Sequence, residues 1–323
     1  MGLQPYEAEA CNGPAFRLGA TWRQRSGLSP RKRAKVNAFL NFLSTPLVYP
    51  SMISKQSHDP LLWSTVAIVL LVALTAVAGI WWPATYARET VYTRAGGVAS
   101  DIVDLFLVVP ILLISGIKAW RGSVPARLVW LGAQGYLFYN FVIYAFGVHF
   151  NALVFVYCAT LGLCFYAAVF SVPFISLEQV AQAYAPRAPR KTVAIVFLVL
   201  SLPTAMFDLR EDVDALLSGT IPQSVIATNE PVNFVHILDL AFLLPALCIT
   251  AILLFRRKPA GYALAPALLA LLAIMSAELA SIMTVMGRAG FGMSVPMIGS
   301  FVVLAMGFTI LLGFYFSRAT RAA

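Results

Sequence analysis

Charged residues are scarce in this sequence. Asp, Glu, Lys and Arg make up 11% of its 323 residues, whereas a soluble globular protein contains about 25%. Hydrophobic residues make up 60%, and they recur in apolar runs of roughly 18 to 25 residues, the length of a helix that crosses a bilayer. The scarcity of charge excludes a soluble globular protein and predicts an all-α, polytopic (multi-pass) protein of a cell membrane.

Metal-binding and redox residues are also few. The sequence has four Cys and three His, and because no two cysteines form a Cys-x-x-Cys pair we interpret them as packing residues. It contains no glycine-rich phosphate loop, zinc finger or RNA-binding signature. The net charge of +9 lies in short basic clusters between apolar runs, as membrane topology signals do. We therefore expect no cofactor, no bound metal and no nucleic-acid partner.

The hydropathy pattern predicts about eight membrane-spanning helices. They cover residues 61–83, 99–120, 126–148, 150–172, 191–208, 232–255, 260–287 and 295–317. If residues 1–59 stay in the cytoplasm, the basic clusters at 118–127, 187–191, 256–258 and 318–321 all fall on the cytoplasmic side, as the positive-inside rule requires. The basic residues that would lie outside are Arg88, Arg94, Arg210 and Arg288. Both termini are therefore predicted to be cytoplasmic.

Residues 1–59 are too few and too polar to form a domain core, so we interpret them as a basic cytoplasmic tail. Its segment 31–43 places Val36, Phe39, Leu40 and Leu43 on one helical face beside a basic cluster. This pattern favours a helix that lies on an anionic leaflet. In the alternative interpretation, translation starts at Met52.

Two pairs of segments nearly repeat each other. "DIVDLFLVVPILLIS" (101–115) matches "HILDLAFLLPALCIT" (236–250), and "TVAIVLLV" (65–72) matches "TVAIVFLV" (192–199). Each copy would hold four spans, an even number, so both copies would enter the membrane in the same direction. The sequence thus predicts two parallel four-helix repeats, residues 60–188 and 189–323. Chance similarity between Leu- and Val-rich helices is the alternative.

Ionisable side chains interrupt several predicted spans near their external ends. Asp101 and Asp104 are three residues apart on one helix face, and the second copy has His236 and Asp239 at these positions. Charges at membrane depth are costly unless they are paired, protonated or hydrated, so such residues are functional candidates. We predict one outward-facing pocket that binds a ligand or handles protons, lined by Asp101, Asp104, Asn140, Tyr144, His236, Asp239 and Glu278.

Other interpretations of these residues stay open. Each carboxyl group can instead pair with a hydroxyl or backbone group and hold two helices together. One His with several carboxylates can also ligate zinc or manganese, although metal enzymes use tighter His-rich spacing. Pro110 and Pro245 are predicted to kink their helices. Residues 208–231 are predicted to form an acidic external loop, which is either simply solvated or attracts cations.

The four-span unit, with an acidic residue, a Leu and a Pro in its second span, resembles the EXPERA module, the four-helix fold of the sigma-2 receptor and the emopamil-binding sterol isomerase. "PTAMFDL" (203–209) is similar to the end of that family's first helix. The resemblance implies a pocket in which carboxylates hold a cationic or sterol-like ligand, here Asp104, Asp208 and Asp239. The first copy departs from the pattern, because its first span ends "GIWWPATYARE" without the matching aspartate. The isomerase's spacing of His and Glu is also absent.

Three classes of function fit the sequence. The first is a protein that, among membrane lipids, binds or handles a lipid or a hydrophobic or cationic amphipathic small molecule. The second is an intramembrane acid/base enzyme, such as an isomerase or cyclase, in which Glu278 and the aspartates exchange protons. The third is a transporter coupled to protons or cations. The absence of a nucleophile motif and the scarcity of polar residues in the inner halves of the spans favour the first class.

Overall fold

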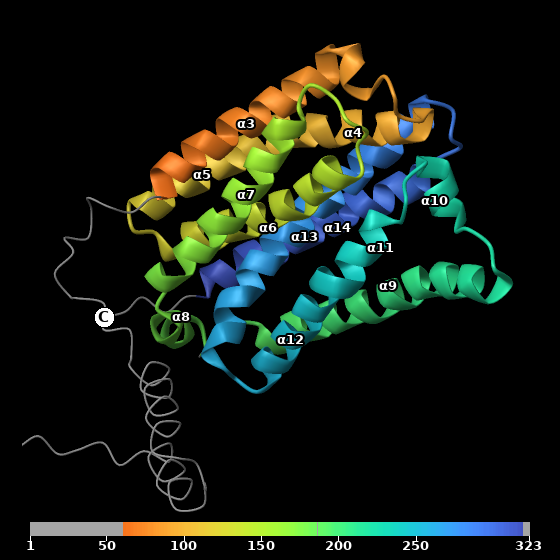
Figure 1. Cartoon of the computed structure of the whole chain (residues 1–323). Helices are drawn as coiled ribbons and strands as arrows, with labels where there is room; N and C mark the ends of the chain where they lie inside the picture. The colour runs from red at the N-terminus through yellow and green to blue at the C-terminus, as the bar shows by residue number, and fades with distance from the viewer. Residues whose placement is uncertain (1–60, 186, 319–323) are drawn as a thin grey trace, which may run out of the picture. The chain divides into compact units, whose positions relative to one another are not determined.

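The structure, a computed structural model, describes residues 61–185 and 187–318. The predicted cytoplasmic tail, its segment 31–43 and the alternative start at Met52 lie outside the described residues. The described residues belong to one compact unit, drawn in Figure 1. They form helices and loops, with no strand among them, so the predicted all-α fold is confirmed for this part of the chain.

The helices follow one another in the order α3 (Leu61–Trp81), η1 (Pro83–Tyr86), α4 (Val91–Val103), η2 (Asp104–Val108), α5 (Val109–Trp120), α6 (Val124–Phe146), α7 (Val154–Ser171), η3 (Val172–Phe174), α8 (Leu177–Tyr184), α9 (Arg190–Ser218), α10 (Gln223–Thr228), α11 (Phe234–Leu238), η4 (Asp239–Leu243), α12 (Leu244–Phe255), α13 (Pro259–Arg288) and α14 (Val295–Ser317).

Seven helical stretches of the described residues are long and apolar enough to cross a membrane. They are α3, α4 to α5, α7 to η3, α9, α11 to α12, α13 and α14. The prediction of a multi-pass membrane protein is therefore confirmed. The predicted span at 126–148 corresponds to α6, which has 23 residues but is not one of the seven, so its crossing stays a prediction.

The helix α9 corrects the predicted acidic loop. It runs on past residue 208 to Ser218, so the first part of the segment predicted as a loop is helical. The acids at 208, 211 and 212 are three and four residues apart. This is the spacing of one helix face, so it fits a helix. The helix ends where Gly219 adopts a φ of 65°, the left-handed conformation that glycine favours after a helix C-terminus. Helices α8 and α10 were also missed in the sequence.

The two near-repeated segments share an unusual backbone feature. Each widens into a π-helix that begins at its aspartate, η2 at Asp104 and η4 at Asp239. Pro110 and Pro245 follow in the first turns of α5 and α12. Proline has no N–H to donate and its ring collides with the carbonyl group four residues earlier, and a π-turn just before it relieves both problems. Each proline thus follows a local widening of its helix, and the predicted kinks stay predictions.

The connections between long helices fall at two ends of the bundle, as Figure 1 shows. One end, called the basic end here, carries the connections 121–123, 175–189 and 256–258. Ten described Lys and Arg residues lie in or near these connections or at the end of α14: Lys118, Arg121, Arg127, Arg187, Arg190, Lys191, Arg256, Arg257, Lys258 and Arg318. The other end, called the acidic end, carries the connections 82–90, 147–153, 219–233 and 289–294.

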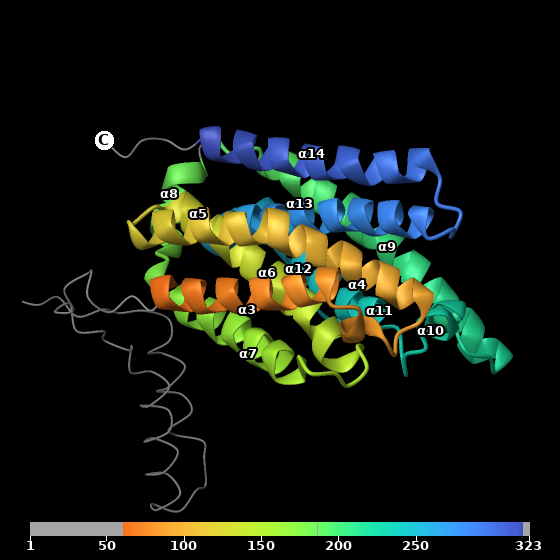
Figure 2. The same ribbon diagram turned by 90° about the horizontal axis from the view of Figure 1, so that it is seen from above.

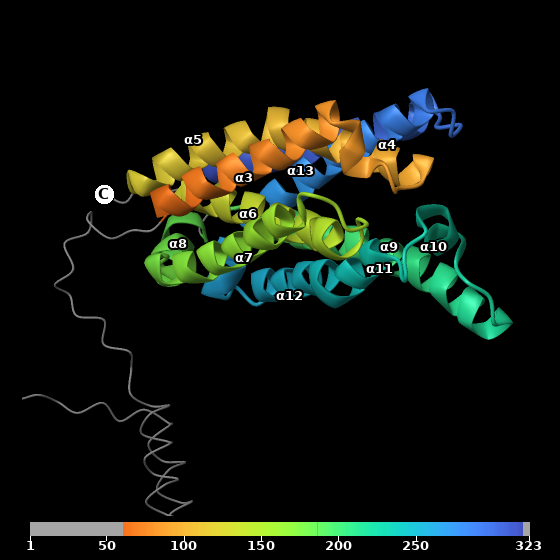
Figure 3. The same cartoon turned by 45° about the horizontal axis from the view of Figure 1, so that its top comes forward.

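The helix α6 lies inside the bundle and packs against α5, α7 and α13. Figure 2 shows α14 at one edge of the bundle beside α13, and Figure 3 shows α3 and α5 along one side of the bundle and α11 and α12 along the other. Helices α6 and α13 approach closely at Gly132, where an added Cβ would lie 2.3 Å from the Ala267 carbonyl oxygen. A glycine is required there because no side chain fits between the two backbones.

We expect Gly132→Ala to destabilise the protein, because the new methyl group has to push α6 away from the α13 backbone. Overpacking of this kind costs about 1–3 kcal/mol, and the measurement is the midpoint of thermal unfolding in detergent micelles. Gly307→Ala is the matched control, because an added Cβ there meets nothing within 4 Å. Equal midpoints for the two variants would contradict the close approach of α6 and α13.

Candidate functional site

A cavity of about 300 Å³ lies at the acidic end between α4, α6, η4 and α13, and residues of α10 and the loop after it complete its mouth. Much of its wall is apolar, with Ile143, Met275, Ile282, Met283 and Met286. Its lining includes the acidic residues Asp239, Glu278 and Glu230 and no Lys or Arg. This cavity is therefore apolar with an acidic edge.

The structure brings four of the predicted site residues to this cavity and leaves four elsewhere. Asp239, Glu278, Asn140 and Tyr144 line it. Asp101 and Asp104 are buried behind the lining, and Asp208 and His236 lie in a separate cluster. The residues that do not line it are Asp101, Asp104, Asp208 and His236.

Asp104 is enclosed by hydrogen bonds from α6. Its side chain is only 1% exposed, and it accepts a hydrogen bond of 3.0 Å from the Tyr136 hydroxyl and one of 3.1 Å from the Asn140 amide. Both donors belong to a polar stripe of α6, in which Tyr136, Asn140 and Tyr144 recur every four residues. Because both bonds lie inside the protein, Asp104 joins η2 to α6 rather than facing the cavity.

Asp101 is fully buried and is held by two tyrosines. The Tyr86 hydroxyl donates to it at 2.6 Å and the Tyr144 hydroxyl at 2.8 Å. On its other side lies Gly79 of α3, where an added Cβ would overlap the carboxyl group. Burial and the adjacent Asp101 carboxyl raise the pKa of Tyr86 well above its usual value, so this phenol remains a hydrogen-bond donor.

Asp239 and Glu278 both line the cavity, and Asp239 has fewer hydrogen-bond donors than Asp101 or Asp104. Asp239 accepts a hydrogen bond of 3.0 Å from Tyr139 of α6. Glu278 has the hydroxyl groups of Ser100 and Tyr136 as hydrogen-bonding neighbours, so Tyr136 lies between Glu278 and Asp104. Among the described residues, neither carboxyl group forms an ion pair with a Lys or Arg.

Sequence reasoning missed Tyr86, Ser100 and Tyr139. Tyr139 follows Tyr136 by three residues, so the helical spacing of the stripe contained a usable signal for it. Tyr86 lies in a short helix of the connection after α3, where no periodicity pointed to Asp101. Ser100 carried no signal of its own, because a lone serine inside an apolar run is common.

His236 and Asp208 form a cluster between α11 and α9 and do not line the cavity. The His236 Nδ1 lies 3.1 Å from an Asp212 oxygen, and its Nε2 lies 3.7 Å from Asp208 and 3.8 Å from Glu211. These contacts join the outer part of α9 to α11. Within the described part of the chain, no three His, Cys, Asp or Glu residues are arranged to hold a metal ion.

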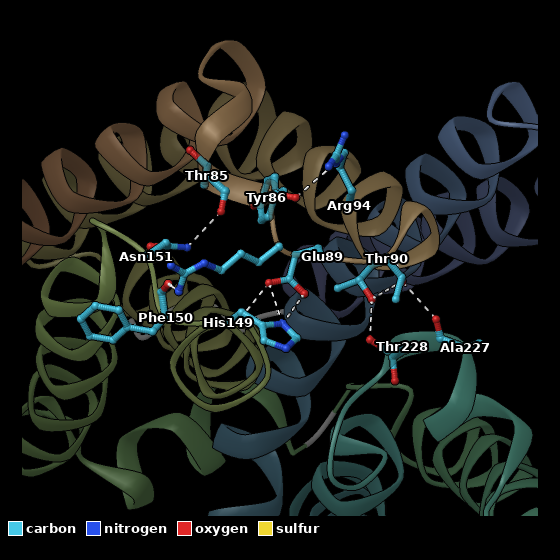
Figure 4. Close-up of polar contacts among 12 residues, drawn as sticks. Thr85, Tyr86, Glu89, Thr90, Arg94, His149, Phe150, Asn151, Ala227 and Thr228 are labelled. Carbon is cyan, nitrogen blue, oxygen red and sulfur yellow. Dashed lines mark hydrogen bonds and ion pairs between the residues drawn. The ribbon is translucent and has the colours of Figure 1, made fainter.

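The loop 219–233 is fastened across the mouth of the cavity by hydroxyl groups of α4 and the residue before it, as Figure 4 shows for Thr90, Ala227 and Thr228. Thr90 donates to the Ala227 carbonyl oxygen at 3.1 Å, and Thr93 donates to that of Thr228 at 3.1 Å. The loop has left-handed residues on both sides of α10, Gly219 and Asn229. It is therefore a short helix between two turns, tied to α4 by two hydrogen bonds.

A second set of ionisable groups lies beside this loop. The carboxyl group of Glu89 accepts hydrogen bonds from the His149 backbone N–H at 2.7 Å and contacts the His149 ring at 3.1 Å (Figure 4). Glu230, which lines the cavity, lies near both residues. Burial, together with the negative charge of Glu89, raises the pKa of Glu230, whereas Thr228 and His149 lower it.

We expect the docking of loop 219–233 to weaken as the pH rises. The folded-state pKa of Glu230 lies above its usual value. Its contribution to the free energy of loop docking is therefore fully present below the ordinary carboxyl pKa and is lost as the pH rises through the raised pKa. Hydrogen exchange of the loop amides, corrected for the intrinsic rate, measures this loss. Glu230→Gln should remove the pH dependence, and Asp214→Asn, an exposed acid at the same end, should keep it. A dependence that persists in Glu230→Gln would refute this role.

Comparison with known proteins gives no information on this site. No protein-family model, curated protein or solved structure matches the chain. The resemblance to the EXPERA module stays a prediction.

Proposed function

We propose that this protein binds an amphipathic molecule with a cationic group in the cavity at the acidic end. The observation that carries the proposal is the pair of acids, Asp239 and Glu278, in the lining of a largely apolar cavity that no Lys or Arg lines. A cationic ligand in this cavity supplies the positive charge that no Lys or Arg of the lining provides. The lipid-like part of the same molecule matches the apolar wall.

The size and chemistry of the cavity agree with a small molecule of this kind. Ligand pockets measure about 300–1,000 Å³ and are mostly apolar with a few placed polar groups, and this cavity is at the lower end of that range. Its three methionines, Met275, Met283 and Met286, are flexible and adapt to ligands of different shape. An amine on a hydrocarbon chain fits both features.

The proposal includes the two predicted repeats, as two parallel halves of the bundle. A two-fold axis between α6 and α13 would bring residues 135 positions apart together, and Gly132 does lie against Ala267. The same axis would relate α4 to α11 and α6 to α13, so a contact between α4 and α13 predicts one between α11 and α6. Both contacts occur. These contacts support two parallel halves, with the basic end in the cytoplasm and the cavity opening to the opposite side.

The same correspondence explains why one aspartate is enclosed and its counterpart faces the cavity. Asp104 is covered by Tyr136 and Asn140. The positions 135 residues later are Leu271 and Met275, which have no strong donor to offer Asp239. In this interpretation the first half uses its aspartate for packing, and the second half leaves its aspartate for a ligand.

The resemblance to the EXPERA module supports the same class of ligand, since that module implies carboxylates around a cationic or sterol-like molecule. Of its three corresponding acids, Asp239 lines the cavity, whereas Asp104 and Asp208 do not. We therefore assign the ligand contact to Asp239 together with Glu278, an acid outside the resemblance.

An intramembrane acid/base enzyme is the second candidate. The observation that favours it is Tyr136, which connects the enclosed Asp104 to the cavity-facing Glu278 and offers a proton a path between them. Lipid profiles of cells with and without the protein distinguish the two candidates, because an enzyme changes the ratio of two isomeric lipids and a binding protein does not.

We expect Asp239→Asn and Glu278→Gln each to weaken the binding of dodecylamine by at least about tenfold, or 1.4 kcal/mol. Each substitution keeps the size of the side chain and removes the charge that attracts the ammonium group. The measurement is equilibrium binding to the purified protein in detergent, with dodecanol as the uncharged comparison ligand.

The matched control is Asp214→Asn, because the Asp214 side chain is 68% exposed at the same end and does not line the cavity. It should bind dodecylamine as the unmodified protein does. Unchanged dodecylamine affinity in both cavity variants would contradict the proposed function.

A further inference from the structure

A second cavity, of about 190 Å³, lies at the acidic end and shares no lining residue with the first. Its walls are two loops, residues 82–88 after α3 and residues 149–153 before α7. Arg88 and His149 are its basic lining residues. No ligand or proton role in the proposed function involves this cavity.

Hydrogen bonds between the two loops hold this cavity in shape. Asn151 donates to the Thr85 carbonyl oxygen at 3.1 Å and accepts from the Leu153 N–H at 2.8 Å. Arg88 donates to the Phe150 carbonyl oxygen at 3.1 Å. Figure 4 shows Thr85, Asn151 and Phe150 around this junction. Because the walls are fixed by these bonds, a ligand meets a cavity that is already formed.

Arg88 brings a positive charge to this cavity. Arg88 is exposed, and no carboxyl group of the described residues lies within ion-pair distance of it. The neighbouring Glu89 has a side chain only 1% exposed and is turned toward His149. The guanidinium of Arg88 therefore has no ion pair among the described residues, whereas the His149 ring is already in contact with Glu89.

The position of the cavity is that of a membrane–water interface. Trp82 directly follows the last residue of α3, which is long and apolar enough to span a membrane. The Trp82 side chain is 57% exposed and that of Phe150 is 71% exposed, and aromatic side chains at the ends of spanning helices sit at the level of the lipid headgroups. An arginine at that depth is surrounded by phosphate groups.

We propose that this cavity binds the phosphate group of a membrane phospholipid. The guanidinium of Arg88 forms paired hydrogen bonds to phosphate oxygens, the geometry that arginine provides and lysine does not. The glycerol and the first part of the acyl chains lie over Trp82 and Phe150. This inference does not rest on the proposed function, since neither Asp239 nor Glu278 takes part in it.

The experiment measures phospholipid retention by native mass spectrometry of the purified full-length chain, with added phosphatidic acid as the probe. Diacylglycerol has the same chains without the phosphate, and glycerol 3-phosphate has the phosphate without the chains. We expect Arg88→Gln to lower phosphatidic acid binding by at least about tenfold, with little binding of diacylglycerol to either protein.

Arg210→Gln is the control, because Arg210 is at the same end with its side chain 84% exposed and lies near Asp214. It should retain phosphatidic acid as the unmodified protein does. Equal retention by Arg88→Gln and Arg210→Gln would overturn the proposal. So would glycerol 3-phosphate that binds as tightly as phosphatidic acid, because the ligand would then be a soluble phosphate. The thermal midpoint of Arg88→Gln shows whether a loss of binding reflects unfolding. If it does, Arg88→Lys replaces it as the test. This variant keeps the charge but loses the paired N–H donors, so we expect an affinity for phosphatidic acid between those of the unmodified protein and Arg88→Gln.

Discussion

Carboxyl groups inside an apolar helical bundle have to be hydrogen-bonded, and this constraint organises the structure. Tyrosine hydroxyls and one asparagine amide, rather than Lys or Arg, provide the partners. Most of these donors come from a single face of α6. The constraint accounts for the burial of α6 and for the polar side chains on its buried face, since a helix that supplies donors to several acids has to lie among them.

The same constraint separates the two enclosed acids, Asp101 and Asp104, from Asp239, which has a single side-chain donor. Asp101 and Asp104 have two donors each and lie behind the cavity. Asp239 has one tyrosine donor and lines the cavity with Glu278. Residues that look equivalent in the sequence thus differ in chemistry because their neighbours on α6 and α13 differ.

The sequence was sufficient to predict the membrane class, the approximate positions of the apolar helices, and an acidic pocket that includes Asp239, Glu278, Asn140 and Tyr144. Each of these depends on composition or on periodicity along one helix. The enclosure of Asp104 by Tyr136 and Asn140, the contact of Tyr86 with Asp101, and the fastening of loop 219–233 to Thr90 and Thr93 depend on which helices become neighbours. That choice is made by packing between segments far apart in the chain, such as Gly132 against Ala267, and no local pattern encodes it.

The central claim is that an amphipathic cation occupies the cavity beside Asp239 and Glu278. Photo-crosslinking with a dodecylamine analogue that carries a diazirine, followed by peptide mass spectrometry, tests it directly. The account predicts labels on cavity-lining residues such as Tyr139, Met275 and Met283, which unlabelled dodecylamine suppresses. Labels confined to the lipid-facing surfaces of α14 and α9, and insensitive to that competitor, would contradict it.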